Sequence, residues 1–151
     1  MSGTNWVYKS FNELTTTELY TILQLRNQVF VLEQACLYQD ADGKDEASFH
    51  LCGWSETNKL VAYCRILPPG LSYTEASIGR VLTAGTQRKK GSGKELMERA
   101  IAETFVLFKV NHIRISAQEY LKSFYQNLGF KSIGNSYLED NIPHIEMIFS
   151  K

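Results

Sequence analysis

A short basic stretch with two glycines, QRKKGSGKEL at residues 87–96, contains the residue types that most clearly suggest binding chemistry. Gly91 and Gly93 allow the backbone to approach a ligand closely, and the side chains around them are rich in positive charge. A helical pattern follows at once, so the stretch also offers the free N–H groups and the positive dipole end of a helix start. These features indicate an anion-binding loop; a solvated basic turn before a helix is the alternative.

Two common nucleotide-binding motifs fail at this loop. A P-loop would need Gly at position 88 and Ser or Thr at position 95, where Arg88 and Glu95 stand. The dinucleotide-binding fingerprint would need a third glycine at position 96, which is Leu96. The sequence therefore predicts anion binding by some other loop geometry.

Acidic residues cluster around Gly43, at Asp40, Asp42 and Asp45. Counted from Asp40, an EF-hand would need Gly at position 45 and Glu at position 51, so the match fails. We expect these carboxylates to be solvated turn residues.

Other potential ligands occur only in pairs. His50 with Cys52, and His144 with Glu146, each share one strand face, but no third or fourth ligand follows at a suitable spacing. No GxSxG motif of a serine hydrolase is present either. Neither a metal site nor a Ser/His/Asp triad is predicted.

The composition is that of one folded domain covering residues 1–151, with 44% hydrophobic and 21% charged residues. A formal net charge of zero argues against a protein whose main role is coating nucleic acid. The three cysteines lack CxxC spacing, which favours a reducing compartment. No apolar run is long enough for a membrane span and no leader pattern is seen, so we expect a cytoplasmic protein without a membrane partner.

Hydrophobic periodicity and turn signals define the expected elements. Strands are expected at 6–11, 48–55, 60–67, 76–84, 112–117, 130–133 and 144–149. Helices are expected from a capping box at 15–18 through residue 30, from the basic loop to residue 108, and at 120–128 before Gly129. Hairpins in the first half and strand–helix–strand units in the second half indicate an α/β chain with a mixed sheet.

The order of these elements, together with two motifs, resembles the GNAT superfamily of acetyl-CoA-dependent N-acetyltransferases. RKKGSG at 88–93 matches its R/Q-x-x-G-x-G/A pyrophosphate loop, and FYQNLGF at 124–130 matches its second signature. Further stretches resemble the ElaA-like branch: 26–38, 40–45, 62–65, 78–81 and 140–145. The resemblance covers nearly the whole chain. It implies a single domain with a mixed, mostly antiparallel twisted sheet and helices on both faces.

Two positions depart from this pattern. Glu146 stands where the ElaA-like branch leads us to expect a small residue, which affects the expected acceptor pocket. Thr83 replaces an aliphatic strand residue, a change that backbone hydrogen bonding should tolerate.

The resemblance implies acetyl-CoA as cosubstrate, bound mainly by main-chain groups. Val81 and Thr83 would pair with the pantetheine arm, and the diphosphate would lie on the loop and the helix start. The expected loop residues are Arg88, Lys89, Lys90, Gly91, Ser92, Gly93 and Lys94. A non-catalytic acyl-CoA sensor is the alternative to an enzyme.

The resemblance also implies direct attack of an amine on the thioester. Tyr125 would protonate the departing thiolate, since a phenol with a pKa of about 10 is protonated at neutral pH. Glu33 or His144, with His50 third, would take the proton of the amine directly or through water.

The acceptor is expected to be a small-molecule or peptide amine. Residues expected near it are Glu33, Tyr38, His50, Arg65, Arg80 and His144. Arg65 and Arg80 could orient an acidic part of the acceptor or pair with Glu33 or Glu75. The sequence leaves both this choice and the existence of a homodimer open.

Overall fold

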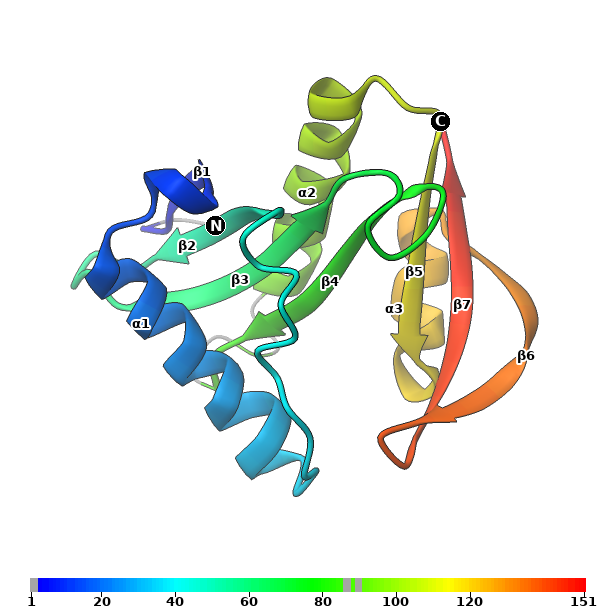
Figure 1. Ribbon diagram of the computed structural model, residues 1–151, viewed down its shortest axis with the longest axis horizontal. Helices are drawn as coiled ribbons and strands as arrows, with labels where there is room; N and C mark the ends of the chain where they lie inside the picture. The colour runs from blue at the N-terminus through cyan, green and yellow to red at the C-terminus, as the bar shows by residue number, and fades with distance from the viewer. Residues whose placement is uncertain (1–2, 86–87, 89–90) are drawn as a thin grey trace.

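The computed structural model describes residues 3–85, 88 and 91–151, whose arrangement is shown in Figure 1. Within these ranges one seven-stranded sheet runs in the order β1-β2-β3-β4-β5-β7-β6. The strands are β1 (Asn5–Ser10), β2 (Phe49–Trp54), β3 (Leu60–Leu67), β4 (Ala76–Thr83), β5 (His112–Gln118), β6 (Lys131–Glu139) and β7 (Ile142–Ser150). Neighbouring strands are antiparallel except β4 and β5, which are parallel. The mixed, mostly antiparallel α/β sheet predicted from the sequence is confirmed.

Helices cover both faces of this sheet. They are η1 (Phe11–Glu13), α1 (Thr16–Arg26), the π-helical segment η2 (Asn27–Glu33), α2 (Ser92–Phe108), η4 (Glu119–Leu121) and α3 (Lys122–Leu128). Ile22 of α1 packs with Tyr63 of β3, whereas α2 and α3 pack with the adjacent residues Ala62 and Cys64. Because consecutive strand residues point to opposite faces, α1 lies on one face and α2 and α3 lie on the other. No helix in the described ranges has the length and apolarity to cross a membrane.

Local sequence signals account for the ends of the helices. Glu18 N–H donates to Thr15 Oγ1 at 3.0 Å and Thr15 N–H donates to Glu18 Oε1 at 2.8 Å, so the capping box predicted before α1 is formed. Gly129 has a φ of 112° at the end of α3, a backbone conformation that favours glycine. Both predicted signals are confirmed.

Two elements differ from the sequence prediction. The first helix was expected to continue through Phe30, but from Asn27 the chain winds as a π-helix, a geometry that is frequent at functional sites. The sixth strand was expected to end at Ile133. A bulge containing Gly134, with a φ of 70°, interrupts the pairing there, and pairing with β7 resumes at Tyr137.

Candidate active site

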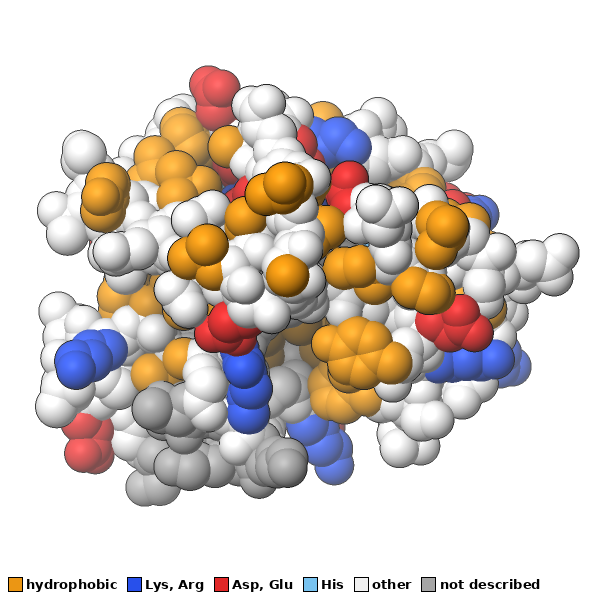
Figure 2. Space-filling view, turned by 90° about the horizontal axis from the view of Figure 1, so that it is seen from below, with side chains coloured by type: hydrophobic (Ala, Val, Ile, Leu, Met, Phe, Trp, Pro, Cys, Tyr) orange, Lys and Arg blue, Asp and Glu red, His pale blue; other side chains and the backbone are white. Residues whose placement is uncertain are grey.

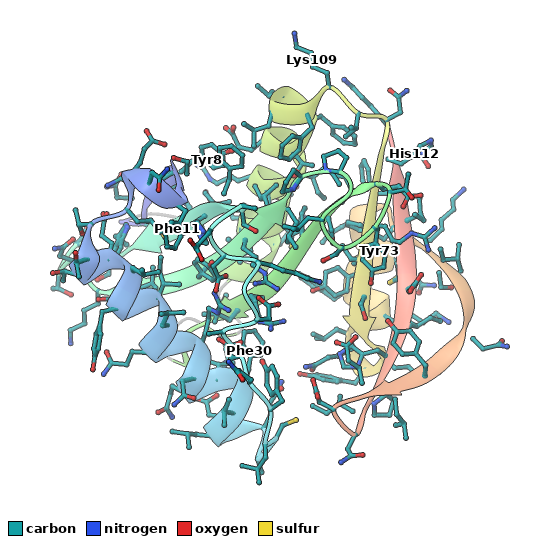
Figure 3. All side chains as sticks on the ribbon, viewed as in Figure 1. Tyr8, Phe11, Phe30, Tyr73, Lys109 and His112 are labelled. Carbon is teal, nitrogen blue, oxygen red and sulfur yellow. The ribbon has the colours of Figure 1, made fainter. Side chains whose placement is uncertain are left out.

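The parallel strands β4 and β5 separate soon after they begin. They pair only at Ala76 with Ile113 and at Ser77 with Arg114. Further along β4, Arg80 has a φ of 51° and the register with β3 shifts, which is a β-bulge. Beyond this point a cavity of about 1120 Å³ lies between the two strands. Figure 3 shows side chains on the two sides of the gap, with Phe30 on the α1 side and Tyr73 near β5; both line the cavity.

The edge of β4 that faces this cavity has no strand paired with it beyond Ser77 in the described ranges. Ala84 N–H donates to the Val61 carbonyl at 2.8 Å, so the peptide groups of Ala84 point toward β3. Since these directions alternate along a strand, the peptide groups of Val81 and Thr83 point the other way, into the cavity. Val81 and Thr83 also line it. The two positions that were expected to pair with pantetheine thus face the cavity, and the Thr83 carbonyl accepts a hydrogen bond from Arg88 Nε at 3.3 Å.

The described part of the basic loop leads directly into α2. Gly91 is the N-cap of this helix with a φ of 79°, and apart from its chain neighbours no atom of the described residues lies within 4 Å of where a Cβ would be. A Cβ on Gly93 would lie 3.6 Å from the ring of Phe124, which is ordinary contact. Ser92 is buried and Lys94 is exposed. Lys89 and Lys90, also expected to bind the diphosphate, lie outside the described residues.

Arg88 connects the basic loop to the end of η2. Its Nη2 donates to Glu33 Oε1 at 2.6 Å, and its Nε donates to the Thr83 carbonyl at 3.3 Å. All three residues line the cavity. A residue expected to bind the diphosphate is therefore paired with one expected to accept a proton.

Tyr125 of α3 reaches the same cavity from the other face of the sheet. The centroid of its ring lies 5.1 Å from that of Phe124 and 5.8 Å from that of Phe130, and both contacts are edge contacts. Tyr125 is only 6% exposed. The hydroxyl has no hydrogen bond to the described residues, and burial raises the pKa of Tyr125 above its ordinary value. The hydroxyl is thus a protonated donor without a protein partner in the part of the chain that the structure describes.

His144 of β7 lines the cavity with one ring nitrogen available. The Ile142 carbonyl lies 2.7 Å from Nδ1, and because a carbonyl can only accept, Nδ1 carries the hydrogen. Nε2 of the neutral ring therefore keeps its lone pair, and it lies 3.6 Å from Glu139 Oε2. The ring stacks on Tyr137.

His50 is placed differently from the expectation that it would be near the acceptor. It is fully buried, with Nδ1 2.6 Å from the Tyr63 hydroxyl and Nε2 3.0 Å from the Asp45 carbonyl. Burial lowers its pKa, and it is absent from the cavity lining found in the described ranges. We therefore leave His50 out of the site.

The acidic loop is held by three arginines from three different elements. The pairs and their shortest N···O distances are Arg26–Asp40 (2.8 Å), Arg26–Asp45 (2.7 Å), Arg65–Asp42 (2.5 Å), Arg65–Asp45 (3.0 Å), Arg80–Asp40 (2.7 Å) and Arg80–Asp42 (3.4 Å). Asp40 and Asp45 are buried. The prediction that these aspartates are solvated turn residues is therefore wrong. The local sequence gives no sign that α1, β3 and β4 each bring an arginine to this loop.

The same network accounts for three residues expected near the acceptor. Arg65 and Arg80 pair with the loop aspartates and not with Glu33 or Glu75. The Tyr38 hydroxyl donates to Asp40 Oδ1 at 2.9 Å, and the Arg80 guanidinium lies over the Tyr38 ring at 5.5 Å. These side chains line the cavity while their polar groups bind one another.

The network should be a large contributor to stability. Asp45→Asn removes one of the two carboxylates that pair with the fully buried Arg26. Breaking a buried ion pair in this way lowers the free energy of unfolding by about 3–5 kcal/mol. Urea unfolding at pH 7 measures the change, with the exposed neighbour Glu46→Gln as control. A loss below about 1 kcal/mol would contradict this assignment.

The pH dependence of this effect has a definite sign. Burial by itself would raise the pKa of Asp45, but Arg26 and Arg65 outweigh it and hold the pKa below its ordinary value. A carboxyl with a lowered folded pKa stabilises the protein above its unfolded pKa of about 3.9, and this contribution is lost as the pH falls through the folded value. The difference in the free energy of unfolding between wild type and Asp45→Asn should therefore become smaller below about pH 4.

Two contacts across the cavity mouth were missed by sequence reasoning. The side-chain amides of Gln34 and Gln118 exchange hydrogen bonds of 3.3 and 3.2 Å, and Cys36 Sγ donates to the Asp140 carbonyl at 3.1 Å. They join the segment after η2 to β5 and to the β6–β7 turn. No local pattern marks such distant partners.

Figure 2 shows the face of the molecule that lies at the bottom of Figure 1. Hydrophobic side chains spread over this face and surround a hollow.

Comparison with known proteins shows the family. A family model described as an acetyltransferase (GNAT) domain matches residues 17–151. The chain belongs to the GNAT acetyltransferase family. This GNAT chain is 38% identical to Protein ElaA of Escherichia coli over 144 residues, or 94% of each protein.

Solved structures agree with this family assignment. The crystal structure of Escherichia coli ElaA has a TM-score of 0.91 at 36% identity, covering 97% of this chain and 99% of that one. An acyl-CoA N-acyltransferase from Pseudomonas aeruginosa has a TM-score of 0.91 at 40% identity, with the same coverage. The resemblance to the ElaA-like branch and the expectation of a GNAT acyltransferase are confirmed.

A more distant structure shares the fold alone. It is an aminoglycoside 6'-N-acetyltransferase in complex with coenzyme A, with a TM-score of 0.71 at 14% identity, covering 95% of this chain and 96% of that one.

Proposed function

We propose that this GNAT protein transfers an acetyl group from acetyl-CoA to a primary amine, by direct attack of the amine while both substrates are bound. The observation that carries the proposal is that one cavity is lined by Val81 and Thr83, on the edge of β4 that β5 leaves open, and by Tyr125, whose hydroxyl has no partner among the described residues. The acceptor is a small-molecule or peptide amine. A cytoplasmic location is part of the proposal, and the three unbridged cysteines are compatible with it.

The binding of acetyl-CoA relies mainly on the backbone. Peptide groups of Val81 and Thr83 pair with the pantetheine arm, and the first turn of α2 with residues 88–94 binds the diphosphate. Gly91 suits this role because the described residues other than its chain neighbours leave the space within 4 Å of its Cβ position open. Once bound, acetyl-CoA supplies the thioester carbonyl that the amine attacks.

Two proton transfers remain for the side chains. An alkylammonium with a pKa of about 10.4 must lose a proton, which costs about 4.6 kcal/mol at pH 7. We assign this proton to His144 Nε2, directly or through water, because Nδ1 is engaged with the Ile142 carbonyl. The Tyr125 hydroxyl gives its proton to the thiolate as the carbon–sulfur bond breaks.

Glu33 is the rival base, and the structure offers a reason to rank it second. Its carboxylate is bound to Arg88 at 2.6 Å. We expect His144→Gln to lower kcat by about 10²-fold or more, within the range for a general base, and Glu33→Gln to lower it less. Steady-state rates at saturating acetyl-CoA measure both. A larger loss of kcat in Glu33→Gln than in His144→Gln would assign the role of the base to Glu33.

A ligand titration followed by an activity assay tests the function itself. Acetyl-CoA should raise the melting temperature increasingly with concentration, and more than inorganic pyrophosphate does, since a ligand that binds only the folded state stabilises it by mass action. Turnover with a panel of amines, followed by thiol release, then separates an enzyme from an acyl-CoA sensor. Stabilisation without turnover of any amine would favour the sensor, and no stabilisation would end the proposal.

A further inference from the structure

Glu139, a residue that sequence reasoning did not single out, is half exposed and lies beside His144 in the lining of the cavity. It is the last residue of β6, and Tyr137 and His144 are direct cross-strand partners in the β6–β7 pair. Glu139 Oε2 lies 3.6 Å from His144 Nε2, and Ser116 Oγ lies 3.5 Å from Glu139 Oε1. Both Glu139 and His144 line the cavity. The carboxylate thus lies beside the nitrogen that we assign as the base.

The two facing atoms are both hydrogen-bond acceptors when His144 is neutral. Nδ1 carries the ring hydrogen, so Nε2 presents a lone pair, and an ionised carboxylate can only accept. Their separation of 3.6 Å exceeds that of a good direct hydrogen bond. A group with several N–H donors and a positive charge would satisfy both acceptors at once. An alkylammonium is such a group.

The charges around this position are predominantly acidic. Arg114 of β5 is the cation of the neighbouring strand, and it pairs with both Glu75 at 3.0 Å and Glu146 at 2.5 Å. Counted with Glu139, this part of the sheet has three carboxylates and one guanidinium, and the guanidinium pairs with two of them. Glu139 makes no ion pair with a lysine or arginine in the described ranges.

Cations elsewhere in the cavity lining are largely engaged. Arg65 and Arg80 pair with the loop aspartates, and Arg88 pairs with Glu33. Lys44 is the exception among the described residues; its Nζ donates to Ser72 Oγ at 2.8 Å, on the side of the cavity formed by the acidic loop. The environment of His144 therefore favours a cationic ligand and disfavours an anionic one.

We propose that Glu139 and His144 together bind the ammonium group of the acceptor, and that the acceptor is a cationic amine without a carboxylate next to the reacting nitrogen. This inference rests on the proposed acetyltransferase function. Glu139 holds the charged amine in place, and His144 Nε2 then takes the proton that the nitrogen must lose. Aliphatic diamines are acceptors of this class, whereas free amino acids acetylated at the α-amine are not.

A matched pair of amines tests the acceptor class. Lysine is 1,5-diaminopentane with a carboxylate on the carbon that bears one amine, so its α-amine has a carboxylate next to the nitrogen and its ε-amine does not. With wild-type protein, kcat/KM for 1,5-diaminopentane should exceed that for acetylation of lysine at the α-amine by at least about tenfold, with the position of the acetyl group determined by NMR. Acetylation of the lysine α-amine as fast as acetylation of 1,5-diaminopentane would overturn the inference while leaving the acetyltransferase function intact. Binding of acetyl-CoA without turnover of any amine would overturn both.

A charge-neutral variant tests the residue. Glu139→Gln should raise the KM for 1,5-diaminopentane about tenfold, leave the Kd for acetyl-CoA unchanged, and abolish much of the increase in KM that added salt causes for wild type. Glu119→Gln, an exposed carboxylate outside the described cavity lining, is the matched control. An unchanged KM would refute the role of Glu139. A shifted pH profile of kcat with unchanged KM would also refute it, because Glu139 would then act on His144 and not on the acceptor.

Discussion

Replacing Tyr125 with Phe should lower kcat by about 10²- to 10³-fold while changing the dissociation constant of acetyl-CoA by less than about twofold, as expected for the loss of a general acid. Phe keeps the ring and its edge contacts with Phe124 and Phe130. Only the hydroxyl is removed. The cause of the lower rate is that the thiolate must then leave without a proton donor, or take a proton from water.

Steady-state kinetics and calorimetric titration with acetyl-CoA measure the two quantities separately. Tyr120→Phe is the control, since Tyr120 also lines the cavity and is 74% exposed. The thermal stability of Tyr125→Phe should stay close to that of wild type, because the lost hydroxyl has no hydrogen-bond partner among the described residues. An undiminished kcat would show that the thiolate receives its proton elsewhere.

Placing a negative charge at the start of α2 should have the largest effect on cosubstrate binding. Gly91→Glu puts a carboxylate beside the proposed diphosphate position and adds a side chain to a backbone with a φ of 79°. Two like charges 4 Å apart repel by about 1 kcal/mol in bulk water and about 4 kcal/mol at an effective dielectric constant of 20. The Kd for acetyl-CoA should rise by roughly 5- to 1000-fold, since about 1.4 kcal/mol corresponds to a factor of ten.

Two further variants separate charge from backbone strain. Gly91→Asn adds a neutral side chain that tolerates positive φ, so it should bind acetyl-CoA more tightly than Gly91→Glu. Gly70→Glu makes the same substitution at a φ of 88°, where apart from the chain neighbours no described atom lies within 4 Å of the added Cβ, and Gly70 is outside the described cavity lining. It should leave the affinity unchanged. Tight acetyl-CoA binding by Gly91→Glu would contradict the placement of the diphosphate.

Features defined by neighbouring residues could be predicted from the sequence. The capping box at Thr15 and Glu18, the helix end at Gly129 and the glycine at the start of α2 all depend on groups within about one turn of each other. Hydrophobic periodicity also depends only on residues close together in the sequence, so the order of strands and helices could be predicted from it. The motifs at 88–93 and 124–130 then indicated the family.

The tertiary structure decided which of the polar residues can act together. Arg26 and Asp45 are 19 residues apart, Arg88 and Glu33 are 55 apart, and Cys36 and Asp140 are 104 apart. Such contacts depend on strand order, on the bulge at Arg80 and on the separation of β4 from β5, none of which leaves a periodic signal. For this reason the acidic loop, predicted to be solvated, is ion-paired and partly buried, and His50 lies outside the site.

The sequence by itself determined the order of the elements and the family, because these follow from local backbone preferences and short motifs, whereas anion binding by the loop stays a prediction. Only the folded chain showed that His144 faces Glu139 and that Arg65 and Arg80 are already paired. The physical reason is that a charged side chain can bind a substrate only if no other side chain already pairs with it. Which side chains pair is decided when segments distant in the sequence come into contact.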